Sequence, residues 1–170
     1  KVVKVPVIMK LGSNLTNPVA LINQLYANGA AAVVLFNRFY QTDINIDTMA
    51  FTSANVMSTP NELPDRLRWT AIASAAVPRL DYAVSGGVHC GKGVIKSILA
   101  GAAAVEVCSV IYQYGAKEIE NMKKELSEWM DEKSYESLSQ FKGKMNAESA
   151  GEINPFERTQ FMRYYSNREE

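Results

Sequence analysis

The chain has 170 residues, 47% of them hydrophobic, and its 18 Lys and Arg residues are balanced by 18 Asp and Glu residues. This composition is typical of one globular domain, and it argues against a disordered tail and against a nucleic-acid surface, which would need an excess of clustered Lys and Arg. One His and two Cys residues are too few for a disulfide scaffold or for a zinc site built from those side chains. The longest apolar stretch, residues 98–105, is far shorter than the roughly 20 residues that cross a bilayer, so we expect no membrane span and a cytoplasmic protein.

The first third of the chain alternates between strand and helix signals. Residues 2–9 are typical of a strand that ends at Lys10, and Asn17-Pro18 is typical of a helix start, with a helix to about residue 28. The continuous apolar run 31–36 predicts a strand covered on both faces. Residues 37–62 lack helical periodicity, and a loop of that length is more often functional than idle. We expect short extended pieces in it near residues 44–46 and 55–57.

The remaining elements follow the same alternation. Helices are expected at residues 63–76, 91–100, 116–132, 135–140 and 155–164, and strands at 80–84 and 103–108. Glu120 and Lys124 are expected to pair on the exposed face of the long helix. Residues 143–154 resemble a polar linker, so we expect one domain over residues 1–142 and a linker with a terminal helix, too short for a second domain, over 143–170.

Four strand-helix units in strict alternation predict an α/β fold with a parallel sheet. Two architectures are compatible with this order. A doubly wound sheet needs only four or five strands, whereas a (β/α)8 TIM barrel needs eight strands and about 250 residues. Length alone favours the open sheet.

Polar residues stand where the predicted strands end, and the carboxyl ends of parallel strands meet at one edge of a sheet. They are Lys10, Asn37, Ser85-Gly86-Gly87 and Cys108-Ser109. A glycine pair lets the backbone approach an anion, although it is equally typical of a simple tight turn. Lys10 could instead be a surface lysine, and Asn37 could only cap a turn. A bulky side chain at Gly87 is expected to clash with a bound phosphate rather than with the protein core.

The chain resembles the dihydroorotate dehydrogenase family over about residues 3–145. The resemblance is carried by Ser85-Gly-Gly-Val-His-Cys-Gly91, Leu99-Ala-Gly-Ala102, Val107-Cys-Ser109 and Tyr135-Glu-Ser-Leu-Ser-Gln-Phe-Lys-Gly143, and more weakly by Pro6-Val-Ile-Met-Lys-Leu11 and Leu35-Phe-Asn37. That family consists of FMN-dependent (β/α)8 barrels. The resemblance therefore implies that the four units are the C-terminal half of such a barrel.

The resemblance also implies roles for individual residues. Lys10 would lie beside the flavin, where its charge stabilises the anion formed when flavin accepts a hydride, and Asn37 would bind the substrate. Gly86 and Gly87, with the backbone N–H groups of Cys108 and Ser109, would hold the FMN phosphate. Ser58 and Thr59 stand where the family carries a glycine pair at the flavin. No catalytic base is visible, because the family's Cys or Ser base would lie upstream of Lys1.

Three further sets of residues can be interpreted from the sequence. Arg38 stands where the family usually has a small hydroxyl residue, so the bound acid could differ from dihydroorotate. Cys90, Cys108 and His89 lie in the phosphate loops and are not expected to act as the base. Trp69 and Trp129 are expected in the core.

The expected function is an FMN-dependent, dihydroorotate dehydrogenase-like oxidoreductase of pyrimidine biosynthesis, acting on a small-molecule acid. The alternative is a non-catalytic half-barrel that binds phosphate, FMN or a protein partner. Half a barrel has two open sheet edges and an apolar inner face, for which the candidates are Val7, Met9, Val33, Leu35 and Val107. We therefore expect the missing N-terminal half-barrel, or a second copy of the chain, as a partner.

Overall fold

The computed structural model describes residues 3–149 and residue 156. Its centre is a four-stranded sheet made of β1 (Ile8–Gly12), β2 (Ala32–Asn37), β5 (Asp81–Ser85) and β6 (Ala104–Glu106). The strands lie in the order β1-β2-β5-β6, and each neighbouring pair is parallel. This arrangement confirms the predicted α/β fold with a parallel sheet of strand-helix units in chain order.

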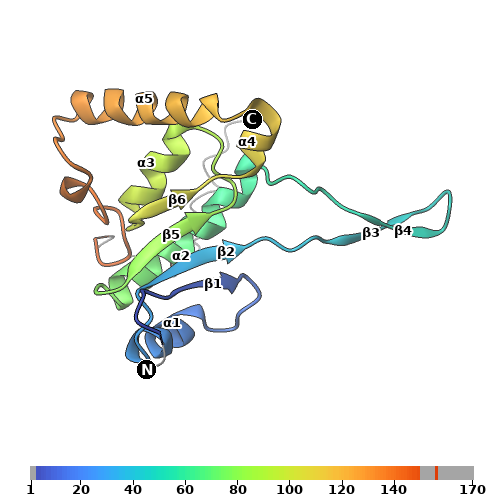
Figure 1. The fold of residues 1–170 in the computed structure, drawn as a ribbon, viewed down its shortest axis with the longest axis horizontal. Helices are drawn as coiled ribbons and strands as arrows, with labels where there is room; N and C mark the ends of the chain where they lie inside the picture. The colour runs from blue at the N-terminus through green and yellow to red at the C-terminus, as the bar shows by residue number, and fades with distance from the viewer. Residues whose placement is uncertain (1–2, 150–155, 157–170) are drawn as a thin grey trace, which may run out of the picture.

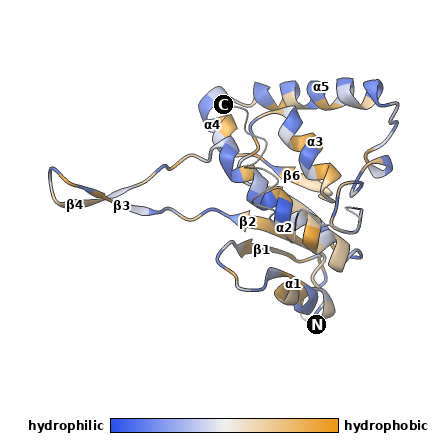
Figure 2. Cartoon of the chain, turned by 180° about the vertical axis from the view of Figure 1, so that it is seen from behind, coloured by the Kyte–Doolittle hydropathy of each residue, from blue (hydrophilic) through white to orange (hydrophobic). Residues whose placement is uncertain are grey.

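Three helices cover one face of the sheet: α1 (Pro18–Ala27), α2 (Leu63–Ala76) and α3 (Gly91–Leu99). Figure 1 looks onto the strands with α2 behind them, and Figure 2 shows α2 lying across the sheet from behind. The start of α1 follows its sequence signal, because the Asn17 side chain accepts a hydrogen bond of 3.0 Å from the Ala20 amide. The predicted helix starts at residues 18, 63 and 91 are all confirmed.

The core lies between the sheet and these helices. Val33 and Leu35 of β2 are fully buried there, together with Ile22 of α1 and Tyr82 of β5. The expectation that Val33 and Leu35 lie on an exposed inner face is therefore wrong. Side chains alternate along a strand, so the residues next to these core positions point to the opposite face. That open face carries Lys10, which follows exposed Met9 and precedes buried Leu11.

The long loop contains a projecting hairpin that its sequence only partly predicts. Strands β3 (Thr42–Asn45) and β4 (Ala50–Ser53) pair antiparallel and extend away from the sheet (Figure 1). The second strand lies at 50–53 rather than at 55–57, because the chain turns early. The Asn45 side chain accepts hydrogen bonds from the amides of Asp47 and Thr48, each 3.0 Å long, and so closes the turn.

The C-terminal third contains α4 (Ser109–Tyr114), α5 (Lys117–Glu132) and the short 3-10 helix η2 (Leu138–Gln140). Helix α4 has no counterpart among the predicted elements. On α5 the ion pair joins Lys124 to Glu128 instead of Glu120, at 3.8 Å. Trp129 packs edge-on against buried Phe141, with ring centroids 5.0 Å apart.

The first part of the predicted linker is hydrogen-bonded to the domain. The amides of Gly143 and Met145 donate to the carbonyls of Ile98 and Leu99 at the end of α3, each over 2.9 Å. The division at residue 142 stays a prediction, and the predicted helix 155–164 lies outside the described residues. In the part of the chain that the structure describes, no helix is long and apolar enough to cross a membrane.

Candidate functional site

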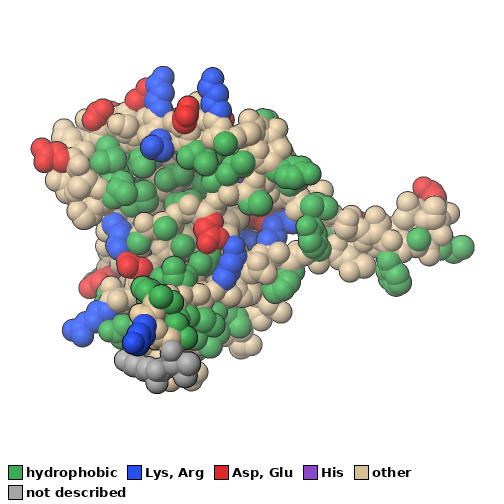
Figure 3. Space-filling view, viewed as in Figure 1, with side chains coloured by type: hydrophobic (Ala, Val, Ile, Leu, Met, Phe, Trp, Pro, Cys, Tyr) green, Lys and Arg blue, Asp and Glu red, His purple; other side chains and the backbone are tan. Residues whose placement is uncertain are grey.

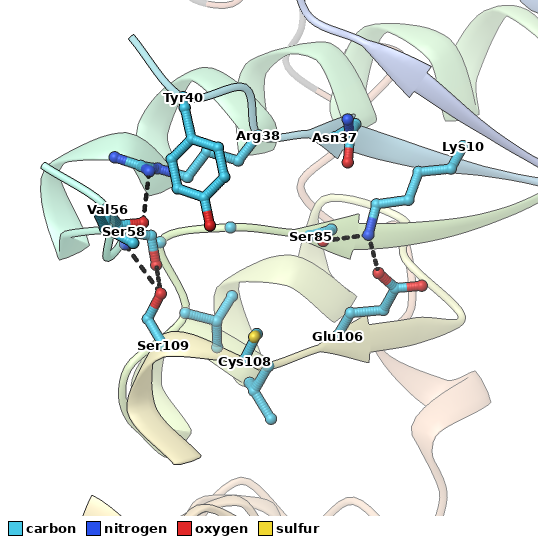
Figure 4. A pocket seen from close by; sticks show the side chains of 14 residues that line it. Lys10, Asn37, Arg38, Tyr40, Val56, Ser58, Ser85, Glu106, Cys108 and Ser109 are labelled. Atoms are coloured by element: carbon cyan, nitrogen blue, oxygen red, sulfur yellow. Dashed lines mark hydrogen bonds and ion pairs between the residues drawn. The ribbon is translucent and has the colours of Figure 1, made fainter. Parts of the chain in front are cut away.

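A cavity of about 540 Å³ opens at the carboxyl ends of the four parallel strands (Figure 4). Seven of the eight predicted site residues line it: Lys10, Asn37, Ser58, Gly86, Gly87, Cys108 and Ser109. They come from β1, β2, the limb that returns from the hairpin, and the loops after β5 and β6. The topology therefore brings together residues that are up to 99 positions apart in the sequence. The eighth residue, Thr59, lines a neighbouring cavity instead, and its amide donates to Glu62 Oε1 over 3.0 Å.

Lys10 bridges three strands across the open face of the sheet. Its Nζ donates to Glu106 Oε2 over 2.7 Å and to Ser85 Oγ over 3.2 Å (Figure 4). The Lys10 and Glu106 side chains are 43% and 44% exposed, so the pair lies at the mouth of the cavity. Glu106 was not among the predicted site residues. The sequence feature that could have identified Glu106 is a charged residue between two apolar residues, Val105 and Val107. The same pattern singled out Lys10.

A chain of hydroxyl groups lies at the other end of the cavity. The Ser58 amide and the Ser58 hydroxyl both donate to Ser109 Oγ, over 2.9 and 3.0 Å. Ser58 Oγ also lies 3.1 Å from His89 Nε2. The Ser58 hydroxyl thus links Ser109 to His89. Ser109 Oγ is the acceptor in both bonds from Ser58, so these bonds do not use its own hydroxyl proton.

Arg38 fixes the limb of the loop that returns from the hairpin. Its Nη1 and Nη2 donate to the carbonyls of Val56 and Asn55 over 2.7 and 2.6 Å, and its Nε donates to both Glu62 oxygens over 3.2 and 3.1 Å. Arg66 contacts the same carboxylate at 3.4 Å. The Arg38 guanidinium is therefore already paired within the protein, and it holds the segment that carries Ser58 against the cavity.

The glycine turn is required by packing inside the protein. Gly86 and Gly87 have φ of +95° and +79°, in the left-handed region that glycine tolerates best. A Cβ at Gly87 would lie 2.5 Å from the Leu63 backbone nitrogen at the start of α2. The expectation that a side chain at Gly87 would clash only with a ligand is therefore wrong, because it would first clash with the backbone of α2.

The two cysteines and the histidine lie at different places relative to the cavity. Cys108 is exposed and lines the cavity, whereas the free thiol of Cys90 does not. His89 reaches the cavity only through Ser58. Among the described residues, no group of three or more His, Cys, Asp or Glu side chains could hold a metal ion.

The curated proteins to which the chain is similar are named as dihydroorotate dehydrogenases. No family model matches the chain. It is 30% identical over 144 residues to the catalytic subunit of dihydroorotate dehydrogenase B (NAD(+)) from Thermoplasma volcanium, covering 83% of this chain and 47% of that protein. It is 39% identical over 75 residues to a probable dihydroorotate dehydrogenase A (fumarate) from Enterococcus faecalis, covering 44% of this chain and 24% of that protein. It is 33% identical over 70 residues to dihydroorotate dehydrogenase (fumarate) from Saccharomyces cerevisiae, covering 41% of this chain and 22% of that protein.

The chain thus spans about half, or less, of the length of these curated relatives. All three relatives are named as dihydroorotate dehydrogenases, which is the family that the motifs of the chain resemble. Over the part that it spans, the chain belongs to the dihydroorotate dehydrogenase family.

Proposed function

We propose that the protein is an FMN-dependent oxidoreductase that dehydrogenates dihydroorotate or a closely similar acid, as a step of pyrimidine biosynthesis. One observation carries this proposal. In a chain of this family, Lys10, Asn37, the Gly86-Gly87 turn and Ser109 line a single cavity at the carboxyl ends of parallel strands. That edge is where α/β proteins bind phosphorylated ligands.

The cavity fits FMN in its size and in its donor groups. Its volume of about 540 Å³ lies within the usual range of cofactor and ligand sites. The glycine turn, the Cys108 and Ser109 amides and the free Ser109 hydroxyl proton are donors suited to a phosphate. The Lys10 ammonium and the Asn37 amide offer polar groups for a flavin ring and a substrate. When bound, FMN supplies a two-electron acceptor for the hydride that leaves a substrate C–H bond.

The chain's own residues have separate tasks in this proposal. Ser109, Gly86 and Gly87 hold the phosphate, and Asn37 orients the substrate through its amide donor and acceptor. Lys10 provides positive charge near the ring system. Arg38 acts by holding residues 55–58 in place, since its nitrogens are paired with Glu62 and two carbonyls. Arg38 therefore supplies no unpaired charge for a substrate carboxylate.

The sheet itself is proposed to be half of a TIM barrel. Among the described residues, β1 and β6 each pair with a strand on one side only. Exposed Val5, Val7 and Ile8 lie at or just before β1, where a further strand would cover them. We propose that further strands, from an N-terminal half-barrel or from a second copy, close the sheet. Light scattering of the FMN-binding species should give a mass above the 18.8 kDa of one chain, whereas a flavin-loaded species of one such chain would contradict closure.

Anaerobic reduction by substrate tests the activity. The protein, expressed from its complete coding sequence and loaded with FMN, should lose its visible flavin absorption when dihydroorotate is added without oxygen. Substitution of Asn37 by Ala should weaken this response by raising the dihydroorotate concentration that is needed, with FMN still bound. A flavin that dihydroorotate fails to bleach at any concentration would exclude the proposed substrate.

A further inference from the structure

The charges around the cavity are almost completely paired. Of the described residues that line it, only Lys10, Arg38 and Glu106 carry a formal charge. Arg38 is paired with Glu62 behind the cavity wall, at 3.1 Å. A ligand in the cavity therefore faces one ion pair, between the ammonium of Lys10 and the carboxylate of Glu106, at 2.7 Å (Figure 4).

This ion pair weakens the positive field that Lys10 would otherwise provide. At 2.7 Å, the Glu106 carboxylate cancels most of the Lys10 charge as seen from a group several ångströms away. Both side chains are now about half exposed, so water screens them. A bound ring system would displace that water, and the remaining charges would then act on the ligand more strongly.

We propose that Glu106 sets the redox balance of the bound cofactor by offsetting the charge of Lys10. This inference rests on the proposed function, because it assumes that FMN occupies the cavity. Two-electron-reduced flavin is largely an anion near neutral pH, whereas the oxidised ring is neutral. Glu106 therefore disfavours the reduced form relative to a site that contains Lys10 alone, and it makes the cofactor easier to reoxidise.

The substitution Glu106→Gln separates this charge effect from a change in structure. A glutamine carbonyl can still accept the hydrogen bond from Lys10 Nζ, and the bond from Lys10 to Ser85 Oγ remains as a second anchor. Only the negative charge is lost. Glu120→Gln is the matched control, because Glu120 is exposed on α5 and does not line the cavity. Both variants change the net charge of the chain equally.

The readout is the midpoint potential of the bound FMN, measured against a reference dye in the protein expressed from its complete coding sequence. Even at a separation of about 12 Å, in a medium with an effective dielectric constant of about 20, a unit charge changes the ratio of reduced to oxidised affinity about tenfold. Because Glu106 lines the cavity, Glu106→Gln should therefore raise the midpoint potential by at least about 30 mV for the two-electron couple. Lys10→Met should lower it, and Glu120→Gln should leave it unchanged.

The outcomes distinguish this inference from the proposed function. An FMN-loaded Glu106→Gln protein whose potential is unchanged, or is lowered, would overturn the role of Glu106 and leave the proposed function standing. A potential that rises equally in Glu106→Gln and Glu120→Gln would overturn it too, since the effect would then be one of net charge. If the parent protein takes up no FMN on titration, the proposed function fails, and this inference fails with it.

Discussion

Ser109 accepts two hydrogen bonds from Ser58, and neither of them uses the Ser109 hydroxyl proton. A hydrogen bond from a hydroxyl group to a charged phosphate contributes about 1.5–3 kcal/mol. Ser109→Ala should therefore weaken FMN binding about tenfold or more, as measured by quenching of flavin fluorescence. Ser109→Thr should retain most of the affinity, because it keeps the hydroxyl. Equal FMN affinity in the alanine variant and the parent would remove Ser109 from the phosphate site.

Gly87 and Gly29 offer a comparison for testing the glycine turn. Both have positive φ, +79° and +89°, but a Cβ at Gly29 meets nothing within 4 Å, whereas one at Gly87 meets the Leu63 backbone nitrogen at 2.5 Å. Both alanine variants place a side chain at a positive φ, and only the one at Gly87 adds a clash. Gly87→Ala should therefore lower the thermal midpoint clearly more than Gly29→Ala. Equal losses of stability would show that the Leu63 contact can relax.

Single residues at strand ends could be predicted from the sequence when their pattern was local. Lys10 interrupts one apolar run of the sequence and Ser109 follows another, and both residues line the cavity. Glu106 shows the same pattern, but its partner Lys10 is 96 residues away, and no local rule pairs the two. The role of Arg38 depends in the same way on Glu62, which lies 24 residues later. The sequence shows Arg38 where the family usually has a small hydroxyl residue. It does not show that Arg38 pairs with Glu62.

At the scale of elements, Tyr82 fastens β5 to α2. Its hydroxyl lies 2.8 and 2.9 Å from the carbonyls of Ala73 and Val77, and burial raises the pKa of the phenol well above its ordinary value of about 10. Tyr82→Phe should lower the free energy of unfolding by about 1 kcal/mol at neutral pH. Denaturant titration measures this loss, with exposed Tyr112→Phe as the control.

The same raised pKa gives a pH dependence of known sign. Above about pH 10 the unfolded chain loses the Tyr82 proton while the folded chain keeps it, so the unfolded state binds fewer protons. The stability of the parent protein then falls as pH rises, and Tyr82→Phe lacks this contribution. The stability difference between parent and variant should therefore narrow above about pH 10. A constant difference would show that the phenol ionises as readily in the folded chain.

Helices were easier to predict than the hairpin and α4. Starts such as Asn17-Pro18 are local signals that the fold retains. Residues 110–114, Val-Ile-Tyr-Gln-Tyr, are instead rich in β-branched and aromatic residues that favour strands, yet they form helix α4, which packs against α5. Hydrogen bonds to the Asn45 side chain close the turn of the hairpin. Because many polar residues surround Asn45, the sequence alone did not identify it as the turn residue.

At the scale of the whole molecule, alternation of strands and helices was sufficient to predict the sheet order, because parallel strands with short crossovers allow few other topologies. The alternation was not sufficient to predict which face of the sheet each strand side chain occupies. The run 33–36 is buried at every position, so its pattern could not separate the helix-covered face from the open one. Figure 3 shows hydrophobic side chains on the projecting hairpin, where Ile46, Met49 and Phe51 are more than four-fifths exposed.

The central claim is that the cavity binds FMN through its phosphate. Calorimetric titration of the protein with FMN and with riboflavin, which lacks the phosphate, tests it most directly. Charge-assisted bonds from Ser109 and the adjoining backbone amides should make FMN bind with one-to-one stoichiometry and at least about tenfold more tightly than riboflavin. Equal affinities for the two flavins, or no uptake of either, would contradict the account.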